Sequence, residues 1–478
     1  MEGGVRVPFI IAGPGIKKGS QSNTPVIGYD LLPTIIDIAN PSFIPDKNID
    51  GGSFKNILFS FIPISFIAGN LILNLNILLF IITTIIFYGR DIINIKLDLL
   101  DKIILFLFSF ILINGLFNNI NNYYYESTSE DLTIAIKTIF YLRFLILYFV
   151  LRYLIEKDVI NFKIFFISCF VCSTFVCLDL IYQLIFGKDI FGLEIVHPRR
   201  LSGPFGDEMV AGSYLQRFSI FSFFLFPFFF KIKSKKILYL ILLLLFFLVF
   251  ISIILSGNRM PLLLFLLIIG LIIFLEKKIR KFFIPFLLIF LTIFLGTYYY
   301  SFKYDRNIYR HFGDFYLKVL EFKYVFSPSE FEEIQSKKPY KVYPNTYIKE
   351  FASGYETWLL NKYIGGGIKS FKVNCKKTDV VNCGPHPHNY YLEILSELGL
   401  VGFFIISTIF IIILYRGFIK KFFIKSKEDY NHIITPFLFV FFAEIIPIKT
   451  TGSFFTTGNA TFLFLMIGII ATLLRKKN

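Results

Sequence analysis

The chain is predicted to be an all-α polytopic membrane protein, and two observations support this fold class. Its 478 residues are 55% hydrophobic and only 17% charged, a composition that cannot cover the surface of a soluble globule. Apolar runs of roughly 17 to 25 residues recur from about residue 57 to the C-terminus, and each can cross a hydrocarbon core of ~30 Å as a helix. The expected environment of the chain is therefore a lipid bilayer.

About twelve membrane-spanning helices are placed by hydropathy. They are expected near residues 57–73, 75–88, 102–117, 132–155, 161–186, 211–230, 237–256, 259–275, 282–298, 392–414, 432–447 and 459–474. The connection after the first helix is very short, so the first two helices are alternatively one re-entrant unit.

The charge pattern of the loops predicts the topology. The formal net charge is +16, but the basic residues fall in short clusters between apolar runs rather than on one soluble face, so no nucleic-acid partner is expected. Clusters such as "KIKSKK" (231–236), "EKKIRK" (276–281) and the terminal "RKKN" all fall on one side of the membrane. The positive-inside rule assigns that side to the cytoplasm, which places both termini inside and the loops of the opposite side in the periplasm or the exterior.

Four parts are expected along the chain: a short segment at 1–50, spanning helices at 57–298, a large periplasmic loop at 299–391 and the last three helices at 392–475. Loops longer than roughly 15 residues tend to be functional or disordered. This loop contains "SGYETWLL" and a Gly triplet, so it is expected to be folded.

The five cysteines divide into two groups. Cys375 and Cys383 lie in the large loop, and a disulfide between them is expected if that loop faces an oxidising compartment. Cys169, Cys172 and Cys177 lie in an apolar helix, where they are interpreted as small packing residues rather than as metal ligands.

A polar stripe at the start of one apolar helix is the main candidate site. In "CGPHPHNYYLEILSELGLVGF" (383–403), the helical spacing places Asn389, Glu393 and Glu397 on one face, with His388 at its outer end. Such a stripe is costly in lipid unless it faces the protein interior or a water-filled cavity. His386 is either a second polar contact or a turn residue beside Pro387, and His388 is alternatively a simple loop residue that caps the helix.

Two arginine-containing segments are expected at the same membrane face. In "LSGNRMPLLLFLLIIG", Arg259 stands at a helix N-terminus, a setting that favours phosphates, although a snorkelling interfacial role is the alternative. In "HPRRLSGPFGDEMVAGSYL", Arg199 and Arg200 precede a Gly/Pro turn that leads into another helix, and the alternative is that they are merely solvated.

From about residue 57 to 475 the chain resembles the O-antigen ligase and polymerase family of bacterial surface-glycan enzymes. The resemblance depends on "HPHNYYLEILSELGLVG", on "RLSGPFGDEMVAGSYL", on the large outer loop and on "SGNRMPLLL" as the Arg-x-x-x-Leu motif with Arg259 and Leu263. It implies transfer of a glycan from an undecaprenyl-diphosphate carrier to a hydroxyl of lipid A core or of another glycan, without metal or cofactor. The motif histidine falls on His388.

One departure from the family pattern concerns the outer loop. Many members carry an arginine before the aromatic residue, where this chain has Tyr355 and Glu356 in "SGYETW". A second loop cation is therefore unassigned, with Arg306 and Arg310 as candidates.

Simple chemistry supports the same roles. A sugar hydroxyl is a weak nucleophile, and a histidine with an ordinary pKa near 6.5 can take its proton. The departing diphosphate needs cations, for which the candidates are Arg259, Arg200 and Arg199. Since the outer loops contain no Asp-x-Asp pair, arginine is expected to replace a divalent metal.

Ligase and polymerase activities cannot be separated from the sequence, and a lipid-linked glycan flippase is the rival from another class. Transporters usually contain repeated helical bundles and charges at mid-membrane. This sequence has no evident internal repeat and few charges inside its helices, which favours an enzyme.

Residues 2–40, "EGGVRVPFIIAGPGIKKGSQSNTPVIGYDLLPTIIDIAN", resemble the late part of a sulfatase catalytic domain. In such enzymes the nucleophile and most metal-binding carboxylates lie upstream, and no such region precedes these residues here. A segment this short cannot bury a core of its own. Residues 1–50 are therefore expected to be a truncated, inactive remnant that comes from a gene fusion or an assembly error.

Overall fold

The computed structural model describes residues 49–475, apart from 127–131, 198–199, 231, 278, 286–287, 289–291, 293–294, 297–298, 300–345, 379–382, 424–430 and 451. Three sets of predictions fall outside these residues: the sulfatase-like segment, Arg199, and the loop cations Arg306 and Arg310.

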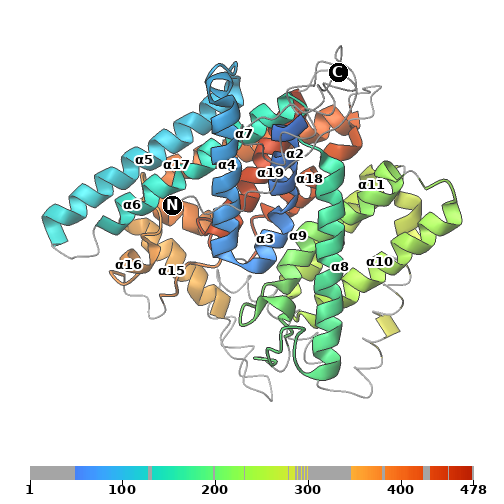
Figure 1. Cartoon of the computed structure of the whole chain (residues 1–478). Helices are drawn as coiled ribbons and strands as arrows, with labels where there is room; N and C mark the ends of the chain where they lie inside the picture. The colour runs from blue at the N-terminus through green and yellow to red at the C-terminus, as the bar shows by residue number, and fades with distance from the viewer. Residues whose placement is uncertain are drawn as a thin grey trace, which may run out of the picture.

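Helices joined by loops make up the described part of the chain (Figure 1). In chain order they are α2 (Ile49–Ser60), α3 (Ile62–Ala68), α4 (Asn70–Ile93), α5 (Leu99–Glu126), α6 (Leu132–Tyr141), α7 (Arg143–Glu156), α8 (Phe162–Phe186), the 3-10 turn η1 (Gly203–Phe205), α9 (Ala211–Phe224), the π-helical turn η2 (Leu225–Phe229), α10 (Lys235–Leu255), α11 (Arg259–Leu275), α15 (Thr346–Leu360), α16 (Phe371–Cys375), α17 (Tyr390–Phe418), the π-helical turn η3 (Ile419–Phe423), α18 (Asn431–Glu444) and α19 (Thr457–Arg475). β-Pairing within the described residues is confined to two isolated bridges, Lys188 with Glu194 and His197 with Arg200.

Seven of the described helices or helix pairs are long and apolar enough to cross a membrane. They are α4, α5, the α6–α7 pair, α8, α10, α17 and α19, and they correspond to seven of the expected spans. Helices α11 and α18 match two further spans, but they are shorter. The all-α polytopic fold is thus confirmed for the described residues.

The remaining expected spans differ from the structure in understandable ways. The span at 57–73 is divided between α2 and α3, because Pro63 occupies the first turn of α3 and begins a new helix there. The span at 211–230 continues from α9 into η2, a π-helical turn that contains Pro227. The span at 282–298 falls largely on residues outside the description.

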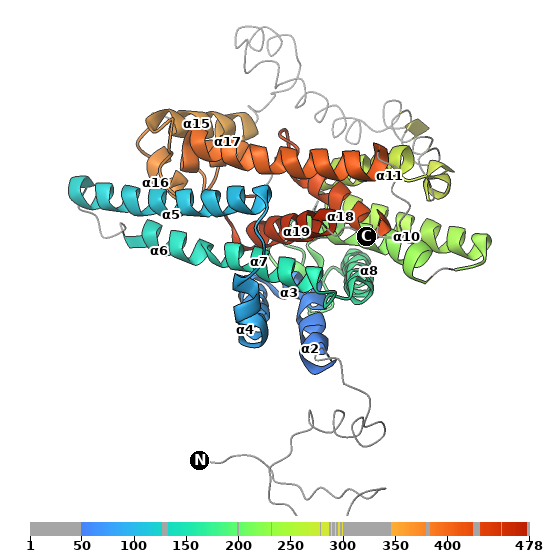
Figure 2. The same ribbon diagram turned by 90° about the horizontal axis from the view of Figure 1, so that it is seen from above.

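Helix α19 lies at the centre of the helical assembly, where α7, α17 and α18 pack around it (Figure 2). Most of the apolar stretch of α19 is buried inside the protein. Aromatic rings fill the contact with α7, since Phe464 stacks on Phe144 with ring centroids 5.7 Å apart. Gly468 lets the backbone of α19 approach Leu151 closely, because a Cβ there would lie 3.2 Å from the leucine side chain. This core holds the ends of α17 and α19 that bear the candidate site.

The segment between α15 and α16 is folded against a break in α17. Gly399 has φ +64°, so the helical path of α17 is interrupted there. The freed backbone groups pair with the neighbouring segment, since Gly367 N–H donates to Glu397 and Leu400 N–H donates to Lys362. A Cβ at Gly365 would lie 2.3 Å from the backbone of Glu397, so the Gly triplet permits this close approach. The expectation that 299–391 contains folded structure is met over 346–378.

Two asparagines of α5 fix the same segment from the other side. Asn114 Nδ2 donates to the carbonyl of Ile364 at 2.9 Å, and Asn118 Nδ2 donates to that of Gly365 at 3.2 Å. Figure 1 shows α15 and α16 along the lower edge of the molecule, the edge at which α8 also ends. The segment before His388 and the loop after α8 therefore lie on one face.

Candidate functional site

His388 lies in the short loop that leads into α17. Its backbone is in the left-handed region, with φ +51°, although it is not a glycine. The side chain is 32% exposed, and its Nε2 lies 3.5 Å from Oε1 of Glu350 on α15. Non-glycine residues in this region carry backbone strain and cluster at functional sites. The structure therefore holds a half-exposed imidazole in a fixed direction beside a carboxylate.

His386 is packed directly against His388. The two rings have centroids 4.2 Å apart and are tilted by 45°. Burial lowers the pKa of His386 to about 4, and the neighbouring charges of His388 and Lys369 act in the same direction. Its Nε2 is buried and has no hydrogen-bond partner within the described residues. Since His386 is neutral at physiological pH, it offers a hydrogen-bonding group rather than a charge.

Asn389 is the N-cap of α17. Its side-chain oxygen accepts hydrogen bonds from the backbone N–H groups of Tyr391 and Leu392, at 2.9 and 3.2 Å. Its Nδ2 donates to the carbonyl of Pro447 at 2.7 Å, which ties the loop after α18 to the same point. Asn389 therefore precedes the helix, whereas its spacing from Glu393 had predicted a place on the helix face, and α17 starts two residues after His388.

Glu393 and Glu397 are both buried, and both hold backbone segments. Glu393 accepts hydrogen bonds from Ser453 and from the backbone N–H of Phe454. Glu397 accepts from the backbone N–H of Lys369 at 2.6 Å. The sequence placed these carboxylates on one helix face with His388. In the structure each carboxylate binds the backbone of one of the two loops that surround His388.

A network of buried charges lies beside the start of α17. Glu444, at the end of α18, accepts from Arg217 of α9 at 2.6 Å, from Lys449 at 2.6 Å and from the Tyr390 hydroxyl at 2.8 Å. Arg217 also donates to Asn459 of α19 at 2.7 Å. Two cations therefore share the Glu444 carboxylate, which also binds Tyr390, two residues after His388.

The sequence did not identify Arg217, Glu444 or Lys449 as site residues. The available signal was the presence of charges in or beside otherwise apolar helices, which in membranes are costly and usually functional.

The loops that carry Arg200 and Arg259, which the sequence placed at one membrane face, are packed together. Leu201 N–H donates to the carbonyl of Leu255 at 3.2 Å, and Asn258 Nδ2 donates to that of Met209 at 2.7 Å. Arg259 is the first residue of α11, and Arg200 is exposed. The helix N-terminus that carries Arg259 thus lies against the loop that follows Arg200.

Helix α9 connects these arginine loops to the histidine end of α17. A Cβ at Gly212 would lie 3.4 Å from both Asn258 and Pro261, so the first turn of α9 touches the turn of Arg259. Arg217 follows Gly212 by five residues, about 7.5 Å along the helix axis. Because Arg217 binds Glu444, which also holds Tyr390, the two motifs are linked through one short helical segment.

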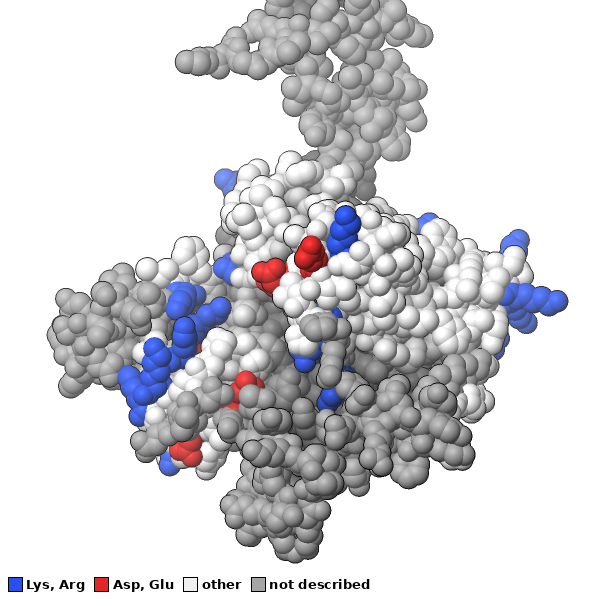
Figure 3. Space-filling view, turned by 90° about the horizontal axis from the view of Figure 1, so that it is seen from below, with Lys and Arg blue, Asp and Glu red and all other residues white. Residues whose placement is uncertain are grey.

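Basic side chains gather on the face that carries these loops. Figure 3 shows a group of Lys and Arg at the left of this face, the side on which Figure 1 places α15 and α16. Five exposed lysines lie in this part of the chain: Lys362, Lys369, Lys372, Lys376 and Lys377. Lys369 has a left-handed backbone, with φ +60°, and it acts electrostatically on His386. Lys369 is therefore a loop cation near the two histidines, and the sequence analysis did not identify it as a site residue.

Two further observations complete the description of the site. Cys375 and Cys383 form a disulfide with a Cα–Cα distance of 5.7 Å, which closes the loop just before His386. Within the described residues, no group of three or more His, Cys, Asp or Glu side chains is arranged to hold a metal ion.

A comparison with protein families found a match over part of this site. Residues 243–407 match the O-antigen ligase family. The matched range contains Arg259, Glu350, His386 and His388, so the resemblance inferred from the sequence is confirmed over the stretch that carries the candidate site. No curated protein matches the chain. The chain thus combines several helices long and apolar enough to cross a membrane with a stretch that matches the O-antigen ligase family.

Proposed function

We propose that the chain is a membrane glycosyltransferase of the bacterial inner membrane. In this proposal it moves a glycan from undecaprenyl diphosphate to an acceptor hydroxyl at the periplasmic face, as an O-antigen ligase. The observation that carries the proposal is the geometry of His388, a half-exposed imidazole held in a strained loop within the O-antigen ligase domain.

The proposed reaction is a single displacement at the anomeric carbon of the donor. His388 accepts the proton of the acceptor hydroxyl while the acceptor oxygen bonds to the anomeric carbon. The bond between that carbon and the diphosphate oxygen breaks, and the electron pair leaves with undecaprenyl diphosphate. Cations near the leaving group stabilise the charge that develops on it.

Arg259 and Arg200 are the proposed partners of the diphosphate. Arg259 stands at the N-terminus of α11, where backbone N–H groups and the helix dipole favour an anion. Arg200 is exposed in the loop that packs on the same turn. Arg199 retains its proposed role from the sequence, and Lys369 joins the set as the loop cation near His386.

Asn389, Glu393, Glu397 and His386 have supporting roles in this proposal. The first three fix the start of α17 and the two loops around it, through the hydrogen bonds described above. His386 is a neutral, partly exposed ring packed against His388, and its proposed role is to contact a sugar hydroxyl of either substrate.

The test is glycan transfer in purified membranes, with an undecaprenyl-diphosphate-linked donor and with variants matched to the parent for protein level. Loss of transfer in His388→Ala supports the proposal, whereas a near-parental rate across pH 6 to 8 contradicts the assignment of the base. The alternative activity within the family is polymerisation of a surface polysaccharide. Glycan from a deletion strain separates the two activities, because a ligase defect abolishes attachment and a polymerase defect shortens the chains.

A further inference from the structure

We infer that Glu350 is the positioning residue of His388: its carboxylate accepts the Nε2–H of the imidazole and leaves Nδ1 as the proton acceptor for the substrate hydroxyl. This inference depends on the proposed function, because it assigns Glu350 a role only through the histidine. A neutral imidazole has one donor and one acceptor nitrogen, and the hydrogen bond made by one nitrogen fixes the role of the other.

The geometry of the pair is the first support. Glu350 Oε1 lies 3.5 Å from His388 Nε2, a distance that a small movement on substrate binding shortens to a hydrogen bond. The Glu350 side chain is 15% exposed, and its second oxygen, Oε2, is buried without a partner within the described residues. Burial raises the pKa of Glu350, and the nearby His388 opposes that rise. The carboxylate therefore retains unused hydrogen-bonding capacity beside the imidazole.

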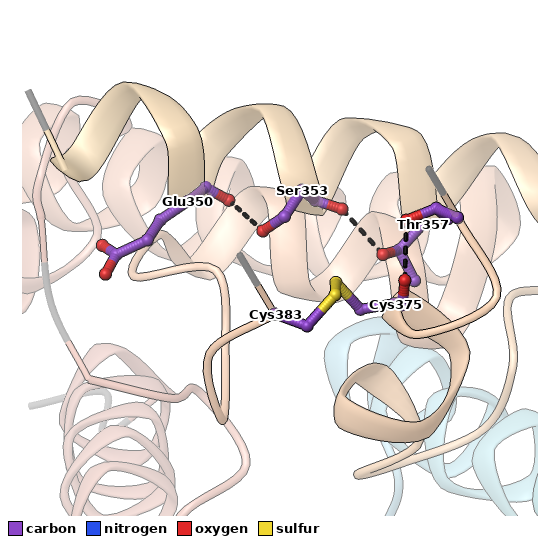
Figure 4. The surroundings of a disulfide bond; sticks show 6 residues. Glu350, Ser353, Thr357, Cys375 and Cys383 are labelled. Carbon is purple, nitrogen blue, oxygen red and sulfur yellow. Dashed lines mark hydrogen bonds between the residues drawn. A yellow bond between two sulfur atoms is a disulfide. The ribbon is translucent and has the colours of Figure 1, made fainter. Parts of the chain in front are cut away.

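The packing of α15 is the second support, because it holds the pair in register. A Cβ at Gly354 would lie 2.8 Å from Pro387 and 3.1 Å from Leu392, so the glycine lets α15 lie directly against the histidine loop. In Figure 4 the Glu350 carboxylate projects from α15 toward the loop that runs from Cys383 into α17. The disulfide to Cys375 fixes the other end of that loop.

The bonding of the other nearby carboxylates is the third support. Glu393 and Glu397 are both engaged with backbone N–H groups, at Phe454 and Lys369. Glu444 holds Arg217, Lys449 and Tyr390. The Glu350 carboxylate, in contrast, faces His388 itself.

The experiment compares four full-length proteins in membranes: Glu350→Gln, His388→Ala, the double variant and the control Glu356→Gln. Glu356 lies on the same helix and is exposed, so its substitution makes the same chemical change away from the site. The rate of transfer from an undecaprenyl-diphosphate-linked glycan is measured against donor and acceptor concentration. The expected result is a fall in kcat of about 10- to 100-fold for Glu350→Gln with little change in KM, the range found when the carboxylate that orients a metal-bound histidine is removed.

The double variant distinguishes a positioning role from a structural one. If Glu350 acts through His388, Glu350→Gln causes no further loss once His388 is alanine. If instead the loss of transfer rate in the double variant equals the product of the two single losses, the inference is overturned. Parental activity in Glu350→Gln, with His388→Ala inactive, also overturns it and leaves the proposed function intact. Parental activity in His388→Ala overturns both.

A conservative variant covers the case in which Glu350→Gln does not reach the membrane. Glu350→Asp keeps the charge and shortens the side chain by one methylene. Its kcat should therefore lie between that of the parent and that expected for Glu350→Gln, which is reduced about 10- to 100-fold. Parental kcat in a well-expressed Glu350→Asp, together with parental kcat in a Glu350→Ala, contradicts the inference.

Discussion

Two buried charged clusters lie at opposite ends of the helical assembly, and they are built differently. The His388 end contains Arg217, Glu444, Lys449 and Tyr390 beside the histidine loop. The Arg475 end contains Asp98, Asp101, Arg152 and Tyr148 around Arg475 of α19. Helix α5 spans the two, because Asp101 belongs to one end and Asn114, about 20 Å further along the helix, fixes the loop of the other.

The Arg475 end is balanced in charge, because three arginines, Arg152, Arg416 and Arg475, meet the three carboxylates Asp98, Asp101 and Glu156. Arg475 lies 2.6 Å from Asp98, 2.7 Å from Asp101 and 4.0 Å from Glu156. Arg152 pairs with Asp101 and, at 3.0 Å, with Glu156. The cluster joins the starts and ends of three helices, α5, α7 and α19. Its paired charges indicate a structural role in holding these helices together.

The His388 end contains two cations on the single carboxylate of Glu444, and it also contains polar groups without a hydrogen-bond partner within the described residues. Two cations share Glu444, and the loop around it contains two left-handed non-glycine residues, His388 and Lys369. Buried nitrogen and oxygen atoms of His386 and Glu350 have no hydrogen-bond partner within the described residues. Arg475 Nη1 at the other end also has no hydrogen bond there, but it lies 4.0 Å from the Glu156 carboxylate. Unsatisfied groups and strained backbone are costly, so they persist where a ligand supplies what is missing. The comparison thus separates a cluster that holds helices from one prepared for an anionic substrate.

The largest expected effect is that of His388→Ala on turnover. The rate of glycan transfer should fall by about 10² to 10⁴, the usual contribution of a positioned acid or base. The thermal midpoint of the detergent-purified protein should stay near that of the parent, because the side chain is 32% exposed and its removal leaves no cavity in the apolar core. Rate and midpoint are measured on the same preparation. If the thermal midpoint of His388→Ala falls far enough to explain the lost activity, the role of His388 is structural and not catalytic.

The reverse behaviour is expected for Asp101→Ala at the Arg475 end. Removing this carboxylate leaves Arg152 and Arg475 without one of their partners, at a cost of about 3–5 kcal/mol for breaking a buried pair. The transfer rate per folded molecule should match that of the parent, because the cluster lies far from the histidine. Denaturant unfolding followed by transfer assays at matched folded protein gives both quantities. A catalytic defect without destabilisation would contradict the assigned division of roles.

The parts of the fold that depend on local chemistry were predictable from the sequence. Helix α11 begins at Arg259 and ends at Leu275, as expected from the turn "SGN", Pro261 and the apolar run that follows. Helix α17 begins directly after Asn389, whose short polar side chain is a good N-cap. Both motifs signal their own helix start within a few residues, so no distant contact is needed to place them.

Contacts between distant segments could not be predicted in the same way. Glu350 reaches His388 from a helix 38 residues earlier in the chain, and Arg217 meets Glu444 across 227 residues. The spacing of Glu393 and Glu397 correctly placed them on one buried face, but it could not reveal that each binds a separate loop. Pairing across such distances is decided by how the helices pack, which a single sequence does not specify.

A smaller loss of activity is expected for Arg259→Lys, which tests whether Arg259 serves an anion. Lysine keeps the charge but cannot form the two parallel hydrogen bonds of a guanidinium with a phosphate, so transfer should fall about tenfold. The exposed Arg280, five residues beyond the end of α11, provides the control, since Arg280→Lys makes the same change far from the site. An Arg259→Lys variant as active as Arg280→Lys would leave Arg259 as an interfacial cation.

The smallest expected effect concerns the pH dependence of stability at His386. Its pKa is lowered to about 4 in the folded protein, below the ordinary value near 6.5, so the unfolded chain binds more protons between these values. The contribution of the neutral ring is therefore complete above pH 6.5 and is lost as the pH falls from 6.5 toward 4. Solvent screening keeps this contribution modest, because the ring is only partly buried.

The measurement for His386 is the thermal midpoint of the purified protein between pH 7.5 and pH 4.5, for the parent and for His386→Gln. Glutamine retains a polar group of similar reach and does not titrate, so its midpoint should fall less than that of the parent on acidification. His197→Gln, at an exposed histidine in the loop after α8, is the matched control and should follow the parent. If the thermal midpoint changes with pH by the same amount in all three proteins, His386 is no less protonated in the folded protein than in the unfolded chain. In that case the neutral ring beside His388 would no longer distinguish the His388 end from the paired charges at Arg475.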